Sequence, residues 1–391
     1  MLRYLTPYLL EDLQRKMVWI GGPRQVGKTT LIRELAENNY SQFEYLNWDS
    51  DIDKQIILKQ HWQTSSELIM FDELHKNPRW KQWLKGVFDT KLDTQQFCVT
   101  GSARMDIYQR GGDSLLGRYH YWRLHPFTLD EWPSELSKDK AIDHLLTFGG
   151  FPEPLLSQNP RVAKRWRNDR YKRIIHEDIR DLEPIREIQL LDLFIASLKE
   201  RVGSTLVLNN IAQDLKISHQ TCSRWLNTFE RMYLGFAIYP LTKNIPRSIQ
   251  KPAKVYFYDN ADTKEDNGAR FENLVATHLL KRLHFLEDCE GLQASLCYIR
   301  DKSGREVDFV TVIDGKVHEL IEVKWSDTNI SSSLRYYKEK LKPKKTVQIV
   351  KTLKKPYESN EILVTNAQSY FANSLWGCPT SIEHRNNMPT S

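Results

Sequence analysis

The stretch Gly21–Thr30 constrains the fold of this chain more than any other feature. It reads GGPRQVGKTT, and from Gly22 onward it fits the pattern G-x-x-x-x-G-K-[ST] without an exception. The run Met17–Ile20 before it is apolar, as expected for a buried parallel strand. Residues Thr29–Asn38 carry apolar side chains at helical spacing. The sequence therefore predicts a strand, a phosphate-binding loop and a helix, in that order.

The residue types in this loop suit the binding of a nucleoside triphosphate. Gly22 and Gly27 allow backbone conformations that bring N–H groups close to an anion. We expect Lys28 to reach the β- and γ-phosphates and the Thr29 hydroxyl to bind Mg²⁺, with Thr30 as the next donor. The residues expected to bind ATP are Gly22, Pro23, Arg24, Gln25, Val26, Gly27, Lys28, Thr29 and Thr30. The alternative, a glycine-rich turn before an ordinary helix, does not account for the flanking strand.

A second motif, residues Leu68–Phe71 followed by two acids, completes the expected site. Four apolar residues predict a buried strand that ends in Asp72 and Glu73. We expect Asp72 to hold Mg²⁺ and Glu73 to act as the general base on the attacking water. A strand followed by an acidic turn is the alternative, and the upstream phosphate-binding loop argues against it.

Polar and basic residues follow the next predicted strands. The strand Phe97–Thr100 is expected between the two strands already described, so that Thr100 or Ser102 can contact the γ-phosphate or the water. Arg118 precedes the predicted strand Tyr119–Leu124 and is a candidate for stabilising transition-state charge, in cis or across a subunit contact. A surface salt bridge is the alternative role for this arginine.

The length and the composition of the chain are typical of a multidomain globular protein. The chain has 391 residues, and its five cysteines are scattered without paired spacing, which predicts reduced thiols in the cytoplasm. No run of 18 apolar residues predicts a membrane span, and no membrane partner is expected. The net charge of +6 is concentrated in two basic runs, 161–180 and 335–355. These runs suit either phosphate backbones or solvated helix faces.

Five segments together resemble one family. They are Gly22–Thr30, Phe71–Glu73, Thr100–Ser102, Ser114–Arg118 (SLLGR) and Phe148–Glu153 (FGGFPE). In this order they are similar to a family of prokaryotic AAA-type ATPases that has a C-terminal domain of uncharacterised function. The resemblance extends to about residue 370. It implies an α/β fold in which a P-loop NTPase core of the AAA type precedes further domains.

The middle of the chain is predicted to be helical. Residues Leu145–Glu200 are helix-rich and resemble the lid that follows an AAA-type core. From 190 to 241 the pattern indicates a winged helix-turn-helix. Asn209 or Asn210 is expected to cap the first helix, and Ser218 the second.

The second helix of this motif has an apolar face and a polar face. The side chains expected inside are Cys222, Trp225, Leu226, Phe229 and Tyr233. Gln220 and Arg224 remain outside, where they suit contacts with DNA bases and phosphates. A winged helix can instead serve as a protein-contact or lid module, so this alternative stays open.

The C-terminal region is predicted to contain a hairpin with charged residues. Strands Glu306–Ile313 and Lys316–Trp325 flank an Asp-Gly turn. Glu322 and Lys324 share one strand face, and Asp308 lies on the neighbouring strand.

The residues Glu272, Asp308, Glu322 and Lys324 are the candidate nuclease site. Two carboxylates can hold Mg²⁺, and Lys324 can orient the attacking water. This stretch resembles the restriction-endonuclease-like fold, which that ATPase family usually carries. A surface hairpin with a Glu–Lys pair is the alternative.

The expected domains are an ATPase core (1–145), a helical lid (146–189), a winged helix (190–250), a nuclease-like α/β domain (251–377) and a tail (378–391). We expect a Mg²⁺-dependent ATPase associated with DNA, with a metal-dependent C-terminal site. The alternative is a nucleotide-dependent switch whose C-terminal parts contact proteins and cut nothing. A homo-oligomer or a protein partner is compatible with both.

Overall fold

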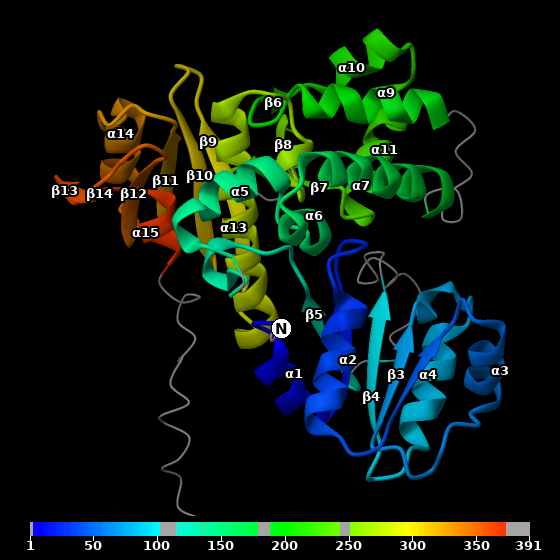
Figure 1. Ribbon diagram of the computed structural model, residues 1–391. Coiled ribbons are helices and arrows are strands. Elements are labelled where there is room, and N and C mark those ends of the chain that lie inside the picture. Colours follow the sequence, from blue (N-terminus) through cyan, green and yellow to red (C-terminus); the bar gives the residue numbers. More distant parts are fainter. Residues whose placement is uncertain are drawn as a thin grey trace, which may run out of the picture.

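A computed structural model describes residues 3–101, 115, 117–134, 136–178, 188–242 and 251–372. Within these ranges the strands form a five-stranded sheet, in the order β2-β3-β4-β1-β5, and a nine-stranded sheet, in the order β13-β14-β12-β11-β10-β9-β7-β8-β6 (Figure 1). Among the helices of the described ranges, none is long and apolar enough to cross a membrane.

The five-stranded sheet forms the N-terminal core. Its strands are β1 (Met17–Gly21), β2 (Phe43–Asn47), β3 (Leu68–Asp72), β4 (Gln96–Gly101) and β5 (Tyr119–Arg123), and its helices are α1 (Thr6–Leu13), α2 (Lys28–Asn39), α3 (Asp51–Lys59) and α4 (Trp80–Asp89). Every strand pair in this sheet is parallel. Strand β4 lies between β1 and β3, which confirms the predicted order. The carboxyl ends of the strands therefore meet at one edge.

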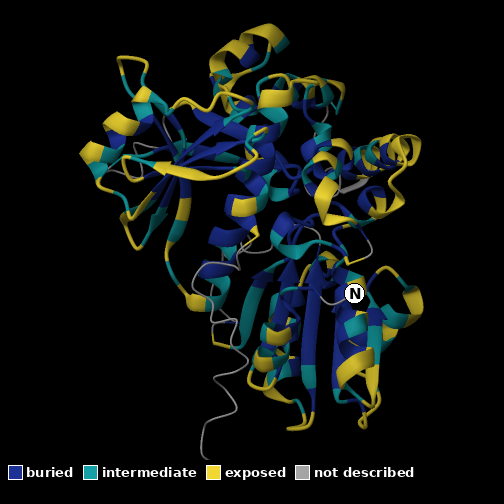
Figure 2. Cartoon of the chain, turned by 60° about the vertical axis from the view of Figure 1, so that its left-hand side comes forward, coloured by how far each residue is buried: buried dark blue, intermediate teal, exposed yellow. Residues whose placement is uncertain are grey.

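Both faces of this sheet are covered because successive side chains on a strand point to opposite sides. Val18 and Ile20 of β1 belong to the core cluster that includes α1 and α2. Met17 and Trp19 belong to the cluster on the other face, with side chains of α3 and α4. The inner strands β1, β3 and β4 are consequently buried between two helical layers, as Figure 2 shows.

The middle of the chain is mainly helical, as predicted. Its elements are α5 (Ala141–Phe148), α6 (Pro152–Ser157), α7 (Pro160–Arg173), the π-helical turn η5 (Ile174–Asp178), α9 (Ile188–Lys199), α10 (Leu208–Leu215), α11 (His219–Arg231), β6 (Thr205–Leu206), β7 (Gly235–Pro240) and β8 (Ala253–Phe257). Ser218 caps α11 by accepting a hydrogen bond from the Thr221 N–H group. The predicted asparagine cap is wrong, because α10 already begins at Leu208 and Val207 holds the cap position without a side-chain bond.

The C-terminal region extends the sheet of β6, β7 and β8. It contains α13 (Asn267–Glu290), β9 (Ala294–Arg300), β10 (Glu306–Ile313), β11 (Lys316–Lys324), α14 (Ser332–Leu341), β12 (Lys345–Val350), β13 (Tyr357–Ser359), β14 (Ile362–Thr365) and α15 (Ala367–Phe371). The predicted hairpin is confirmed: Ile313 pairs with Lys316 across Asp314 and Gly315, whose φ angles are 49° and 73°. Strand β7 pairs with β9, so the two predicted domains on either side of residue 250 share one sheet.

The long helix α13 joins the C-terminal region to the N-terminal core. Arg123, at the end of β5, forms ion pairs with Glu287 (2.7 Å) and Asp288 (2.6 Å) of α13. Farther up the same helix, Lys281 pairs with Glu131 at 2.7 Å, and the Lys281 side chain is only 1% exposed. Figure 1 shows α13 running from the large sheet down to α1 and β5. The two regions therefore meet across a buried, charged interface.

Candidate nucleotide site

The loop between β1 and α2 has the backbone that its sequence predicts. Gly22, Gln25 and Gly27 have φ angles of 149°, 64° and 98°. At Gly22 a side chain is also excluded sterically, because a Cβ atom would collide with the carbonyl oxygen of Leu124. Positive φ angles favour glycine, so the two glycines let the loop curl over the N-terminus of α2. This geometry directs N–H groups toward a bound anion.

Lys28 lies inside the loop as a buried cation. Its ammonium group donates hydrogen bonds to the carbonyl oxygens of Gly22 and Pro23, both at 2.8 Å. Burial lowers the pKa of Lys28 to about 8, while the carboxylates of Glu73 and Asp72 oppose that shift. A desolvated ammonium group favours an anionic ligand, which supports the predicted contact with phosphate.

Asp72 is the centre of a hydrogen-bond network at the ends of three strands. Its carboxylate accepts bonds from the hydroxyl groups of Thr29 (2.7 Å), Tyr45 (2.6 Å) and Thr100. Burial acts to raise the pKa of Asp72, but these hydrogen bonds outweigh it and the pKa is lowered. Asp72 is therefore ionised at neutral pH. The adjacent hydroxyl and carboxylate oxygens of Thr29 and Asp72 are the ligand types that Mg²⁺ prefers, so the residues present fit this cation.

Glu73 is held in an unusual backbone conformation beside Asp72. Its φ angle is 55°, and its N–H group donates to the Thr100 carbonyl oxygen at 3.1 Å. Burial raises the pKa of the Glu73 carboxyl group. His75 Nδ1 lies 3.5 Å from Glu73 Oε2, but burial lowers the pKa of His75 to about 4, so that ring is neutral at pH 7. Glu73 is thus a base of increased strength without a cationic histidine beside it.

The polar residues predicted after β4 are only partly described. Thr100 is fully buried and its hydroxyl group bonds to Asp72 Oδ1. It therefore positions Asp72, which differs from the predicted contact with the γ-phosphate. Ser102 lies outside the described residues.

Arg118 lies far from the P-loop of its own chain. Its carbonyl oxygen accepts a hydrogen bond from the N–H group of Met17, at the start of β1, whereas the loop follows Gly21 at the other end. Five strand residues span about 16 Å. The Arg118 guanidinium group instead pairs with Asp89 of α4 at 2.7 Å. The role in cis is therefore wrong for this arrangement. The predicted alternative, a surface salt bridge, is present in the structure, and the role across a subunit contact stays a prediction.

Two buried arginines reach the P-loop without having been predicted. Arg170 of α7 donates from Nε to the Arg24 carbonyl oxygen at 3.3 Å, and its guanidinium carbon lies 4.2 Å from the centroid of the Phe151 ring. Arg3 donates to the Val26 carbonyl oxygen at 3.1 Å and pairs with Glu131 at 2.6 Å. Arg170 lay within the predicted basic run, but nothing in the sequence distinguished it from its exposed neighbours.

The four candidate nuclease residues do converge in the C-terminal region. Phe309 pairs with Ile321, which brings the neighbouring residues Asp308 and Glu322 together on adjacent strands. The pKa of Glu272 and that of Glu322 are both raised to about 7, by burial first and by the Asp308 carboxylate second. Lys324 pairs with Glu322 at 2.8 Å.

Lys254 of β8 lies among these acidic side chains and neutralises part of their charge. Its ammonium group lies 2.6 Å from Glu306, 3.4 Å from Glu272 and 3.6 Å from Asp308, and its side chain is 1% exposed. A cation thus lies between Glu272 and Asp308, whereas the sequence predicted Mg²⁺ between Asp308 and Glu322 with Glu272 nearby. Within the described ranges, no three His, Cys, Asp or Glu side chains are arranged to hold a metal ion. The predicted metal-dependent site must be corrected to a lysine-neutralised cluster.

The residues predicted to contact DNA lie on the exposed side of α11. Gln220 and Arg224 are exposed, whereas Cys222, Trp225 and Phe229 are buried against the other helices and strands of this region. This division matches the predicted faces of the helix. The structure therefore presents these two polar side chains to solvent.

Comparisons with known proteins agree with the P-loop geometry. Residues 14–132 match a family model described as an AAA domain. The parallel sheet and the P-loop of this segment agree with that match, so the segment resembles the AAA type of P-loop domain. Residues 139–261 and 267–370 match two models, each described as a domain of unknown function (DUF8612 and DUF4143).

The similar whole proteins do not reveal a function. An uncharacterised protein of Methanocaldococcus jannaschii is 24% identical over 84% of this chain and 80% of its own length. An uncharacterised protein of Mycobacterium tuberculosis is 23% identical over 82% of this chain and 73% of its own length. Among solved structures, the RuvB Holliday junction branch migration motor of Thermotoga maritima aligns with 63% of this chain and 94% of its own, at 16% identity and a TM-score of 0.33. A score this low does not establish a common fold over the whole chain.

Proposed function

We propose that this chain binds Mg²⁺-ATP at the P-loop and hydrolyses it. One observation carries the proposal: the Thr29 hydroxyl group of the P-loop and the Asp72 carboxylate lie 2.7 Å apart, and Glu73 follows Asp72 directly. When bound, Mg²⁺ supplies neutralisation of phosphate charge. Thr29 and Asp72 are the side chains that would hold it.

Side chains of the protein itself have the other roles in hydrolysis. Lys28 provides a desolvated positive charge next to the phosphates, where it counters charge developed during transfer of the terminal phosphoryl group. Glu73 accepts a proton from the attacking water or orients that water. Thr100 and Tyr45 keep the Asp72 carboxylate fixed through hydrogen bonds. Arg118 of a neighbouring copy is proposed to supply a further cation to the nucleotide site.

The test is calorimetric titration of ATP with Mg²⁺ into the wild type and Lys28→Ala. The variant is expected to bind ATP at least about tenfold more weakly, because it lacks the buried cation. Lys59→Ala, an exposed lysine of α3, is the matched control and should bind like the wild type. Equal affinity in wild type and Lys28→Ala would reject the nucleotide site.

We further propose that the protein associates with DNA through the exposed face of α11. Gln220 and Arg224 support this proposal because both are exposed on a capped helix whose other face is buried. Arg224→Ala should lower the affinity for duplex DNA and reduce the log–log salt slope by about 0.9. Unchanged affinity and slope would favour a protein-contact module instead.

Lys254 favours the alternative in which the C-terminal cluster does not cleave nucleic acid. A buried ammonium group repels a divalent cation, and two lysines already counter the acids of the cluster. The wild type is expected to leave DNA and RNA uncut with Mg²⁺ or Mn²⁺ in every nucleotide state. Cleavage that is lost in Glu322→Ala would overturn this proposal and restore the nuclease site.

A further inference from the structure

Helix α7 has one buried face and one exposed face that is rich in basic side chains. Arg170 lies on the inner face, 4% exposed, where it contacts the P-loop through the Arg24 carbonyl oxygen. The outer face carries five exposed cations, whose side chains form no ion pair with any residue that the structure describes: Arg161, Lys164, Arg165, Lys172 and Arg173. Asp169 is the one acid on that face of α7. The helix is thus anchored on one side and strongly basic on the other.

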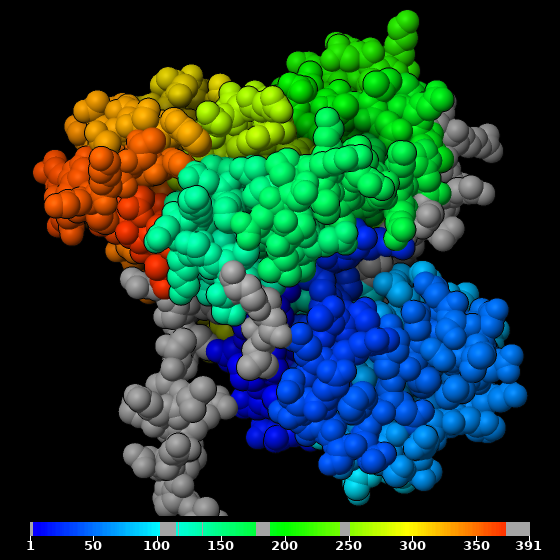
Figure 3. Space-filling model, viewed as in Figure 1, coloured from blue at the N-terminus to red at the C-terminus, as the bar shows by residue number. Residues whose placement is uncertain are grey.

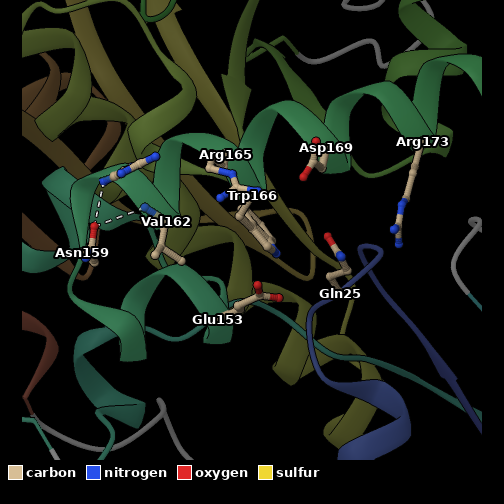
Figure 4. A pocket seen from close by; sticks show the side chains of 9 residues that line it. Gln25, Glu153, Asn159, Val162, Arg165, Trp166, Asp169 and Arg173 are labelled. Atoms are coloured by element: carbon tan, nitrogen blue, oxygen red, sulfur yellow. Dashed lines mark hydrogen bonds between the residues drawn. The ribbon is translucent and has the colours of Figure 1, made fainter.

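Three of these arginines border a cavity of about 670 Å³ between α7, α6 and the P-loop. Its wall includes Arg161, Arg165, Arg173, Trp166 and Gln25. Figure 4 shows the Trp166 ring and the Arg173 side chain extending from α7 toward the loop that carries Gln25. In Figure 3 the segment that contains α7 lies on the surface, above the ATPase core. The cavity is open to a ligand from solvent.

Trp166 forms part of the wall of this cavity. Its side chain is almost fully buried, at 5% exposure, and its indole Nε1 has no hydrogen-bond partner. The Nε1 atom has almost no accessible surface, so the ring and not this N–H group faces a ligand in the cavity. Phosphate oxygens are acceptors that suit the guanidinium groups of the same wall.

The length of the basic row identifies the class of ligand. Residues 161 and 173 are twelve positions apart on one helix, which corresponds to about 18 Å. A free phosphate or a single triphosphate is too short to engage the whole row. A nucleic-acid strand places one phosphate about every 3.4 Å along the duplex axis, so it can contact the full length. Glu153 and Asp169 in the same wall are outnumbered by the three arginines.

We propose that the outer face of α7, together with this cavity, binds the phosphodiester backbone of a nucleic acid next to the P-loop. The site differs from the proposed DNA contact of α11, and the binding it predicts does not require ATP hydrolysis. Arg170 holds α7 against the P-loop and the Phe151 ring, so the basic row is positioned before the ligand arrives. Preorganisation of this kind lowers the entropic cost of binding.

The experiment compares full-length protein with the triple variant Arg161→Ala, Arg165→Ala, Arg173→Ala. Affinity for a 30-nucleotide duplex and for a single strand is measured between 50 and 200 mM salt. Loss of three phosphate contacts should reduce the log–log salt slope by about 2.7 and weaken binding at least about tenfold at low salt. The matched control Arg335→Ala, Lys354→Ala, Lys355→Ala removes the same charge from the other basic run and should bind like the wild type.

The outcomes separate this proposal from the others. Wild-type affinity in the α7 triple variant, or no nucleic-acid binding by the wild type at low salt, would overturn it. Equal losses in the two triple variants would also overturn it, since net charge and not the α7 site would then decide binding. If ATP hydrolysis is absent while the α7 triple variant alone loses DNA binding, the ATPase proposal fails and this one stands. Unchanged thermal unfolding and basal ATP turnover in the triple variant show that its fold is intact.

Discussion

The hydroxyl groups of Tyr121 and Tyr233 lie 2.9 Å apart and join the N-terminal core to the segment that follows α11. Tyr121 belongs to β5, and its hydroxyl group packs so closely on Gly21 that a Cβ atom there would collide with it. Tyr233 has a φ angle of 52°, which is strained for a bulky residue. The start of the P-loop and the end of α11 are therefore in contact through two side chains.

We expect this tyrosine pair to behave as one energetic unit. Tyr121→Phe and Tyr233→Phe should each lower the free energy of unfolding by about 0.5–1.5 kcal/mol, because each removes the hydrogen bond between the two hydroxyl groups. The double variant should lose less than the sum of the two. Urea unfolding of all four proteins measures the coupling, and strictly additive losses would show that the contact contributes nothing.

ATP affinity should fall as the pH rises above 8. Burial lowers the pKa of Lys28 to about 8 in the free protein, so the ammonium group that attracts phosphate is progressively lost above that pH. Between pH 7 and pH 9 the affinity of the wild type is expected to drop about tenfold. Lys28→Arg, which stays charged, should bind more weakly but show little pH dependence. Identical pH profiles for the two proteins would contradict a role for the Lys28 charge.

Glu73→Gln should separate ATP binding from hydrolysis. The amide preserves the size of the side chain but accepts no proton, so turnover should fall by about 10²–10⁴-fold while ATP affinity stays within about threefold of the wild type. Single-turnover hydrolysis and calorimetry measure the two quantities. Retained turnover would assign the general base to another group.

Arg118 should act on the nucleotide site of a neighbouring copy. Arg118→Ala is expected to lower kcat by about 10³–10⁵-fold, and its activity should return on mixing with Glu73→Gln, which supplies an intact Arg118. Asp89→Ala frees the same guanidinium group from its ion pair and should keep turnover, which makes it the control. If mixing the two inactive proteins restores nothing, the arrangement across subunits is wrong.

The stability of the C-terminal region should decrease as the pH rises through the range of about 4 to 7. Glu272 has a pKa raised to about 7 by burial and by Asp308, against about 4.3 in an unfolded chain. The folded state therefore holds the proton more tightly, and stability falls as the pH climbs through this window. The urea midpoint of the wild type should be lower at pH 8 than at pH 5.5.

Glu272→Gln should reduce this difference in urea midpoint without abolishing it. Glu322 and Glu319 also have pKa values raised to about 7, mainly by burial, and they remain in the variant. Glu358→Gln, an exposed acid on β13, should leave the wild-type difference unchanged. An equal effect of the two variants would assign the pH dependence to general surface charge.

The sequence alone was sufficient to predict features that depend on residues close together in the chain. Backbone conformation is set within a few residues, so the glycine pattern of Gly22–Gly27 and the Asp-Gly turn before Lys316 could be recognised and both appear in the structure. The apolar runs of β1 and β3 likewise predicted that these strands are buried. Asp72 lies at the carboxyl end of β3, the edge of a parallel sheet at which ligands bind. The faces of α11 followed from helical periodicity.

The tertiary structure alone decided which distant side chains meet. Lys254 reaches Glu272 and Asp308 because β8, a strand of the shared sheet, packs against helix α13. No spacing in the sequence predicts that contact. Arg118 lies at the wrong end of β5 for its own P-loop, whereas Arg170 reaches the loop from another helix. The sequence alone does not distinguish a buried charged side chain from an exposed one. Its role depends on the long-range packing that brings it a partner.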